Sequence, residues 1–357
     1  MSELTNASGG TADLRGALLS TACSAALLAI FYAGTPAMAG DGNADNPIVW
    51  VEVGGAFTQL NNSQEIYLPP FAQGTDRKVF ITQSPLYPEK NAPISWDGNA
   101  KVSFEPEGTD WAFSAAIRYG RNTTDRVQDQ RTRYKTPTQG DLAYNAYQHV
   151  TAKTSESHMV LDFSAGKDVG LGKFGSAASS VFSLGVRYAQ FNSRSNVDVS
   201  YQPTNQYRHY RLFHASLTAA RKFTGIGPSL SWDASAGLIG NPQAGSVALD
   251  WGLNGAVLFG RQQVNGHHHS SNAFHSNPIT IYPGTPTSAV QHRNKETIVP
   301  NVGGFAELSL RYPNAKLSIG YSADLFFGAI DGGIDARKIY NRGFYGPFAS
   351  ISIGVGG

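Results

Sequence analysis

Apolar and polar residues alternate with a period of two along much of this chain. The longest run lies between Leu317 and Phe327, where every second residue is apolar or aromatic and the residues between them are mostly small or polar. Strict alternation of this kind predicts a β-strand with one apolar face. The run is about twice the usual strand length of five or six residues. The question is what kind of sheet contains such long strands with one apolar face.

The same alternation predicts ten further strands. They lie within residues 47–60, 99–107, 110–120, 158–166, 180–190, 211–223, 229–238, 250–260, 304–312 and 344–357. Their polar faces carry serine, glycine, threonine and asparagine with single charges, and aromatic residues such as Trp111, Tyr119 and Tyr345 gather at strand ends. Strands of this pattern are typical of transmembrane β-barrels. Lipid cannot satisfy backbone hydrogen-bonding groups, so such a sheet must close on itself.

The predicted connections alternate between short and long. Short ones are expected at 106–109, 170–175, 225–227 and 313–315, and long polar ones at 61–98, 121–156, 193–207, 263–297 and 330–343. Outer-membrane barrels combine short periplasmic turns with long extracellular loops. We therefore predict an all-β fold, a closed antiparallel transmembrane β-barrel of about 10–12 strands with long extracellular loops.

The number of alternating segments does not agree with the even number of strands that a barrel of this type requires. Two periplasmic termini require an even number of strands, whereas eleven segments alternate. Either residues 229–240 do not form a separate crossing, or a weakly alternating strand at 141–151 has to be added.

The amino-terminal 39 residues resemble a secretory signal. Arg15 precedes an apolar run that ends in Ala37, Met38 and Ala39, a pattern that predicts cleavage after Ala39. A retained membrane anchor is the alternative, but small residues interrupt the run. We therefore predict a signal peptide at 1–39 and a transmembrane β-barrel at 40–357.

Composition narrows the class of protein further. The single cysteine, Cys23, lies in the predicted signal, so the exported chain would have no disulfide, which fits a Gram-negative envelope protein better than a small secreted scaffold. Without residues 1–39 the chain has 27 basic and 24 acidic residues, a net charge of +3 that is too small to indicate a nucleic-acid partner. We predict the outer membrane of a Gram-negative bacterium as the location. The expected partners are outer-membrane lipid and lipopolysaccharide, with homo-oligomerisation left open.

Three stretches resemble a known family. They are GFAELSLRYPNAKLSIGYSADLFFGAIDGGID (304–335), NRGFYGPFASISIGVG (341–356) and DWGLNGAVLFGRQ (250–262). They are similar to the Legionella-type major outer membrane protein family of pore-forming barrels, most clearly over 247–357, and the resemblance implies an outer-membrane porin. Two features depart from the pattern. The disulfide-linked assembly of the Legionella type has no counterpart without cysteine, and the chain ends in SIGVGG where barrels commonly end in an aromatic residue.

Histidines are concentrated in one predicted loop. His267, His268, His269 and His275 lie within 265–275, and His292 follows in the same loop. Histidine is a common metal ligand. However, no acidic residue or cysteine accompanies the cluster, and consecutive histidines do not readily face one ion. A solvated loop is the preferred interpretation, and we predict no metal site and no cofactor.

One trio of residues allows a catalytic interpretation. His214, Ser216 and Asp233 are predicted on inward faces of neighbouring strands. Lipid hydrolases of the outer membrane place their catalytic groups on the lipid-facing side, so we interpret the trio as lumen lining. No catalytic residue and no enzymatic activity are predicted.

Charged residues on the inward faces form the best functional set. They are Glu52, Lys101, Glu105, Arg118, Asp162, Arg187, Asp233, Asp250, Glu307, Arg311, Lys316 and Asp324. Charges around a narrow aqueous pore determine which ions enter, so we predict pore-lining roles and passive diffusion of ions or small hydrophilic solutes. The alternative is that these charges pair across the lumen, which would give a non-conducting structural or adhesive barrel that presents long surface loops.

Overall fold

The computed structural model describes residues 49–61, 94–106, 109, 111–135, 143–169, 179–203, 209–241, 244–276, 280–283, 287–331 and 339–355. The predicted signal at 1–39 lies outside these residues. Eleven strands form one antiparallel sheet in the described part: β1 (Val49–Asn61), β2 (Ile94–Phe104), β3 (Trp111–Lys135), β4 (Ala143–Asp168), β5 (Ser179–Pro203), β6 (His209–Asn241), β7 (Gly245–Ser276), β8 (Thr280–Pro283), β9 (Thr287–Tyr312), β10 (Ala315–Asp331) and β11 (Ile339–Val355). None of these residues belongs to a helix long and apolar enough to cross a membrane.

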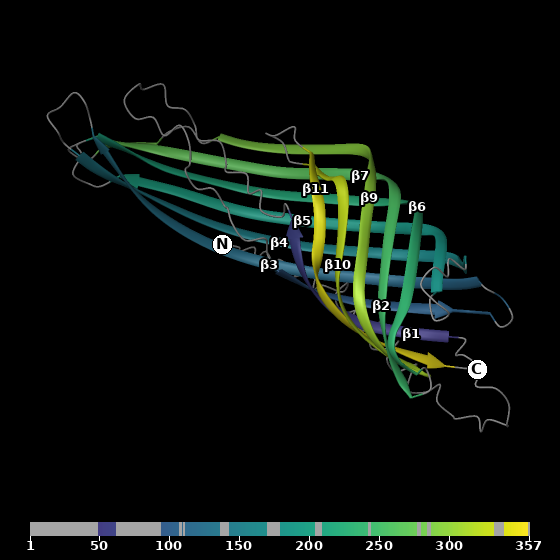
Figure 1. Cartoon of the computed structure of the whole chain (residues 1–357). Coiled ribbons are helices and arrows are strands. Elements are labelled where there is room, and N and C mark those ends of the chain that lie inside the picture. The colour runs from purple at the N-terminus through teal and green to yellow at the C-terminus, as the bar shows by residue number, and fades with distance from the viewer. Residues whose placement is uncertain are drawn as a thin grey trace, which may run out of the picture. The chain divides into compact units, whose positions relative to one another are not determined.

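Ten of the strands close into a barrel (Figure 1). Strand β1 pairs with both β2 and β11, and β6 pairs with β7, whereas the short β8 pairs only with the end of β7. Following paired residues from Val49 once around the barrel leads back to Asn61, 12 residues further along β1. A large offset of this kind belongs to strongly tilted strands, at roughly 35–45° to the barrel axis. The predicted fold class is therefore confirmed, with ten strands.

The two ends of the barrel differ as predicted. Val49 and Val355 pair at the end where neighbouring strands are joined by short turns, such as Pro313–Asn314 between β9 and β10. In outer-membrane barrels this short-turn end faces the periplasm. The opposite end carries the connection between β1 and β2, whose residues 62–93 lie outside the described part of the chain.

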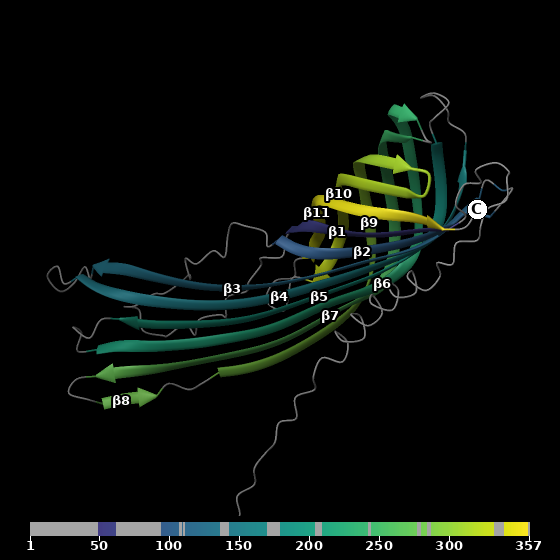
Figure 2. The same cartoon turned by 90° about the horizontal axis from the view of Figure 1, so that it is seen from below.

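The strands are longer than the sequence pattern predicted. The expected turn at 225–227 is wrong, because these residues lie inside the 33-residue strand β6, which joins two of the eleven predicted segments into one. From residue 143 on, the weak pattern at 141–151 is the start of β4 and not an additional strand. Much of the expected loops 121–156, 193–207 and 263–297 is also strand. Figure 2 shows β3, β4, β5, β6, β7 and β9 continuing beyond β1, β2, β10 and β11 as one curved layer, which we call the extension.

The extension reverses the sense of the alternation. In the barrel the apolar residues face outward, but on the extension Val150, Val197, Val199 and Leu217 lie on the inner face and are buried, whereas His214 faces outward and is exposed. Outside the membrane the outer face meets water, so polar residues are stable there. The apolar pattern therefore marks where a strand crosses lipid and not where the strand ends.

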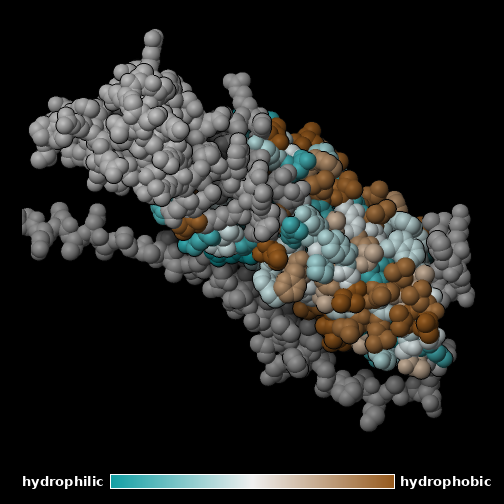
Figure 3. Space-filling model, turned by 60° about the vertical axis from the view of Figure 1, so that its left-hand side comes forward, coloured by the Kyte–Doolittle hydropathy of each residue, from teal (hydrophilic) through white to brown (hydrophobic). Residues whose placement is uncertain are grey.

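An apolar band surrounds the barrel. Leu317 and Ile319 on β10 are 56% and 66% exposed, as expected for side chains that contact lipid. Figure 3 shows one side of the band as a group of hydrophobic atoms. Towards the long end of the barrel, the outward apolar runs finish near Phe57, Trp96, Tyr119, Tyr188 and Tyr345. Aromatic girdles of this type form at membrane interfaces.

Candidate functional site in the barrel lumen

The register places eleven of the twelve predicted lining residues on the inner face. Paired residues share a face, and the pairs Glu52–Lys101, Asp162–Arg187, Asp250–Glu307 and Arg311–Lys316 each combine two of them. The twelfth, Glu105, follows the last residue of β2 and is exposed. Their role in conduction remains a prediction, but the geometry shows which of them meet.

One cluster occupies the periplasmic part of the lumen. Lys316 Nζ lies 2.6 Å from Glu307 Oε1 and 2.9 Å from Asp250 Oδ2. Arg311 also pairs with Asp250 and donates a 2.7 Å hydrogen bond to Ser235 Oγ. Two cations and two carboxylates from β7, β9 and β10 therefore neutralise one another, although the Arg311 and Lys316 side chains remain 36% and 24% exposed.

A second cluster spans the lumen at mid-depth. Arg118 on β3 lies 2.7 Å from Asp324 on β10, so this ion pair links opposite walls of the barrel. Arg187 on β5 donates hydrogen bonds of 2.6 and 3.1 Å to the two carboxylate oxygens of Asp162, and its NH1 lies 3.9 Å from Asp324. The same guanidinium also donates to Asn254, at 2.7 Å, and to Asn301. Arg187 thus ties five strands together around one point.

Further ionic pairs lie on the extracellular side and were not predicted from the sequence. Arg342 on β11 lies 2.9 Å from Glu156 on β4, and both side chains are buried. His158 Nε2 lies 2.9 Å from Asp97 Oδ2. The other carboxylate oxygen of Asp97, Oδ1, accepts a hydrogen bond from the Ser95 hydroxyl. Glu156, Asp97 and Arg342 fell within predicted loops. Every second residue of a strand faces the same side. Glu156, Asp97 and Arg342 therefore share the inward face with Asp162, Lys101 and Ser350 on their respective strands.

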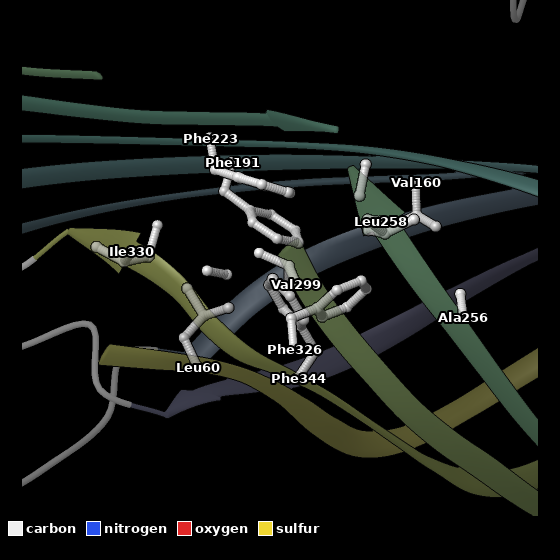
Figure 4. Close-up of a cluster of buried hydrophobic side chains, with 12 residues drawn as sticks. Leu60, Val160, Phe191, Phe223, Ala256, Leu258, Val299, Phe326, Ile330 and Phe344 are labelled. Atoms are coloured by element: carbon white, nitrogen blue, oxygen red, sulfur yellow. The ribbon is translucent and has the colours of Figure 1, made fainter. Parts of the chain in front are cut away.

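An aromatic layer fills the lumen next to the mid-depth cluster. Phe191, Phe223, Phe326 and Phe344 project inward from β5, β6, β10 and β11, and each is at most 2% exposed. Their ring centroids lie 4.8 Å apart for Phe191 and Phe326, and 5.4 Å apart for Phe191 and Phe344. Figure 4 shows these rings together with Leu60, Leu258 and Val299. The Arg118 guanidinium carbon lies 5.7 Å from the Phe344 ring centroid, so the ionic and aromatic layers are in contact.

The sequence pattern did not reveal this aromatic layer. Phe326 interrupts the polar side of the β10 alternation and directly precedes the outward Phe327, which is 40% exposed. Phe223 lies at an inward position of β6, opposite Phe191. An aromatic residue at an alternate position that is otherwise polar, such as Phe326, was the sequence feature that could have indicated the layer.

The predicted histidine loop is part of strand β7 and not a loop. Residues 265–275 lie within β7. His267 and His269 face outward, and His292 on β9 contacts Asn265 and Asn294. The side chains of His268 and His275 lie outside the described residues. Among the side chains that are described, no group of three histidine, cysteine or acidic residues is arranged to hold a metal ion.

The trio considered for catalysis does not form one site. Asp233 lies on the inner face of β6, whereas His214 and Ser216 lie on the outer face of the extension, because their parity along the same strand is opposite. The predicted inward position of His214 and Ser216 is therefore wrong, since the polar face of a strand is the outer one once the strand has left the membrane.

The closed ten-strand barrel, its apolar band and its polar lumen define an outer-membrane β-barrel. The chain belongs to the family of the Legionella pneumophila major outer membrane protein precursor, whose model matches residues 64–354. This confirms the resemblance found in the sequence and the location in the outer membrane of a Gram-negative bacterium.

Solved structures with similarity to the chain are distant. The transport unit of the autotransporter AIDA-I from Escherichia coli is 10% identical, with 89% of this chain and 94% of that chain covered and a TM-score of 0.30. The Ralstonia pickettii toluene transporter TbuX is 8% identical, with coverages of 87% and 90% and a TM-score of 0.21. No curated protein matches the chain. At these TM-scores the similarity does not define a shared function.

Proposed function

We propose that this protein is a narrow pore for ions and small hydrophilic solutes in the outer membrane. The observation that carries the proposal is the partial exposure of charged side chains inside the barrel. Asp162 is 30% exposed and Arg118 is 21% exposed, although both project inward. This partial exposure supports access of water to the mid-depth cluster, whose charges have both signs.

The narrowest part of the proposed pore is the aromatic layer. Hydrophobic constrictions close a pore to ions by excluding water, since an ion cannot shed its hydration shell there. Conduction then requires the rings of Phe191, Phe326 and Phe344 to separate. The proposal accordingly expects brief openings of low conductance rather than a permanently open channel.

A second candidate function is a non-conducting barrel that presents its surface to partners. The full burial of the four phenylalanines favours it, because they fill the lumen in the described structure. The cross-lumen pairs Arg118–Asp324 and Arg342–Glu156 favour it too, since each holds opposite walls together.

Two adjacent phenylalanines allow a matched test. Phe326→Ala removes a ring that is fully buried in the lumen, and Phe327→Ala removes one that is 40% exposed on the outer face. Purified protein in planar lipid bilayers should show small conductance steps for the wild type, larger or longer ones for Phe326→Ala, and unchanged ones for Phe327→Ala. Heat-modifiable migration on denaturing gels checks that each variant is folded. Folded wild type and Phe326→Ala that both fail to conduct would establish the non-conducting barrel.

A further inference from the structure

Three cations lie side by side on the outer face of the extension. They are Arg194 on β5, Lys222 on β6 and Arg261 on β7, and all three are exposed. Arg194 pairs with Ala220, two residues from Lys222, and Lys222 pairs with Gln263, two residues from Arg261. Each cation is therefore a diagonal neighbour of the next, at about 7–8 Å between Cα atoms. We call this group the outer basic patch.

The tilt of the strands brings the patch close to one height above the membrane. Paired positions climb by 12 residues towards the long end in one circuit from Val49 to Asn61, which is about one residue per strand. Residues of β6 and β7 that lie at the same height above the membrane as a residue of β5 are therefore nearer to the membrane than its register partners on these strands. Lys222 and Arg261 lie two and four residues on the membrane side of the row through Arg194, in the direction that this correction requires.

The patch lies just beyond the apolar band. Arg261 follows the outward Phe259 by two residues, and Arg194 follows the outward Tyr188 by six. With a rise of about 3.3 Å per residue and a tilted strand, this places the charges roughly 5–15 Å outside the band. Polar headgroups occupy this depth of a membrane, and in the outer leaflet of a Gram-negative outer membrane those headgroups carry phosphates.

These cations differ from the cations of the lumen in their partners. Arg118, Arg187 and Arg342 each pair with a carboxylate inside the barrel. Arg194, Lys222 and Arg261 form no hydrogen bond or ion pair with any residue that the structure describes. Glu296 is the register partner of Arg261 across β7 and β9 on the outer face, so one carboxylate lies beside the patch. Within the described strands, this row of cations is therefore available to an external anion.

We propose that the outer basic patch binds phosphate groups of lipopolysaccharide in the outer leaflet. Phosphate accepts paired hydrogen bonds from the planar guanidinium of arginine, while lysine contributes a mobile point charge. A phosphorylated glycolipid fits this surface better than a soluble anion because its acyl chains would cover the apolar band directly below. The proposal is independent of whether the lumen conducts.

The test uses the full protein in detergent, with diphosphorylated lipid A as the probe and dephosphorylated lipid A as its control. Wild type should bind the diphosphorylated form about tenfold or more tightly, as expected for several charge-assisted hydrogen bonds. Combined Arg194→Gln, Lys222→Gln and Arg261→Gln should abolish this preference. Lys167→Gln should retain it, because Lys167 is exposed on the outer face at the opposite, short-turn end of β4.

Two further measurements test the role of charge and the source of the phosphate. Lys222→Arg should keep the preference, which shows that charge and not a specific ammonium matters. Millimolar inorganic phosphate should displace little lipid A. Equal binding of both lipid forms by wild type, an unchanged preference in the folded triple variant, or full displacement by inorganic phosphate would each overturn the proposal.

Discussion

Two outward residues with the same exposed fraction should respond differently to a charge. Ile319 and Val127 are both 66% exposed, but Ile319 lies within the apolar band and Val127 lies on the extension. Arginine at position 319 has to enter hydrocarbon, which costs about 2–4 kcal/mol near the bilayer midplane. Arginine at position 127 meets water on the outer face, so its effect should stay within about 0.5 kcal/mol. The loss expected at position 319 corresponds to roughly a 30- to 700-fold change in the folding equilibrium.

The assay is reversible unfolding by guanidinium in phospholipid vesicles, followed by tryptophan fluorescence. Ile319→Arg should lower the midpoint clearly, with an unchanged denaturant dependence, whereas Val127→Arg should leave it near the wild-type value. Equal losses at the two positions would show that the band does not end where the register places it.

An arginine on the lumen side of the same strand should also destabilise the barrel. Ser318 is 2% exposed and donates a 3.1 Å hydrogen bond to Glu307, so the lumen is packed at this point. We expect Ser318→Arg to destabilise the barrel by overpacking, typically by about 1–3 kcal/mol.

Two further predictions concern selectivity and strand packing. Replacing Arg118, Arg187 and Arg311 by Gln should shift the reversal potential of a conducting pore towards cations, because guanidinium groups stay charged at any working pH and their carboxylate partners would remain; an unshifted potential would mean that ions do not pass these residues. Gly227→Ala should destabilise by about 1–3 kcal/mol, since the added Cβ would collide with the carbonyl oxygen of Val257, whereas Gly98→Ala should be close to neutral because nothing lies within 4 Å of its Cβ position. Comparable unfolding midpoints for the two glycine variants would contradict the expected collision.

Alternation alone predicted the membrane-crossing part of the fold. Between Leu317 and Phe327 the outward phase was read correctly, because lipid on one side and a mostly polar lumen on the other impose opposite requirements on neighbouring residues. The same rule failed beyond the membrane. At His214 the outer face of the strand meets water and the inner face is apolar and buried, so the pattern still indicates a strand but its phase is reversed.

Eleven of the inward charges were also found by parity, but the way in which they pair was not. Arg118 and Asp324 lie more than 200 residues apart in the sequence, and no local pattern relates them. Their contact depends on barrel size and strand tilt, which follow from the strand count and the register offset together. Phe344 illustrates the same limit, since its ring neighbours come from other strands, Phe191 from one that is distant in sequence and Phe326 from one that the register brings beside it.

Closure of the barrel has a consequence for how the chain reaches the membrane. The last ladder, between β1 and β11, joins residues near positions 49 and 355, so almost the whole sequence separates its two strands. Contacts of such long range form slowly because a large loop must close first. Until then, Arg118 and Asp324 have no opposite wall to meet, and the open strand edges would leave backbone groups unsatisfied in lipid. Insertion and closure must therefore be coupled, and a truncated chain that lacks β11 should remain a substrate for periplasmic proteases rather than a smaller barrel.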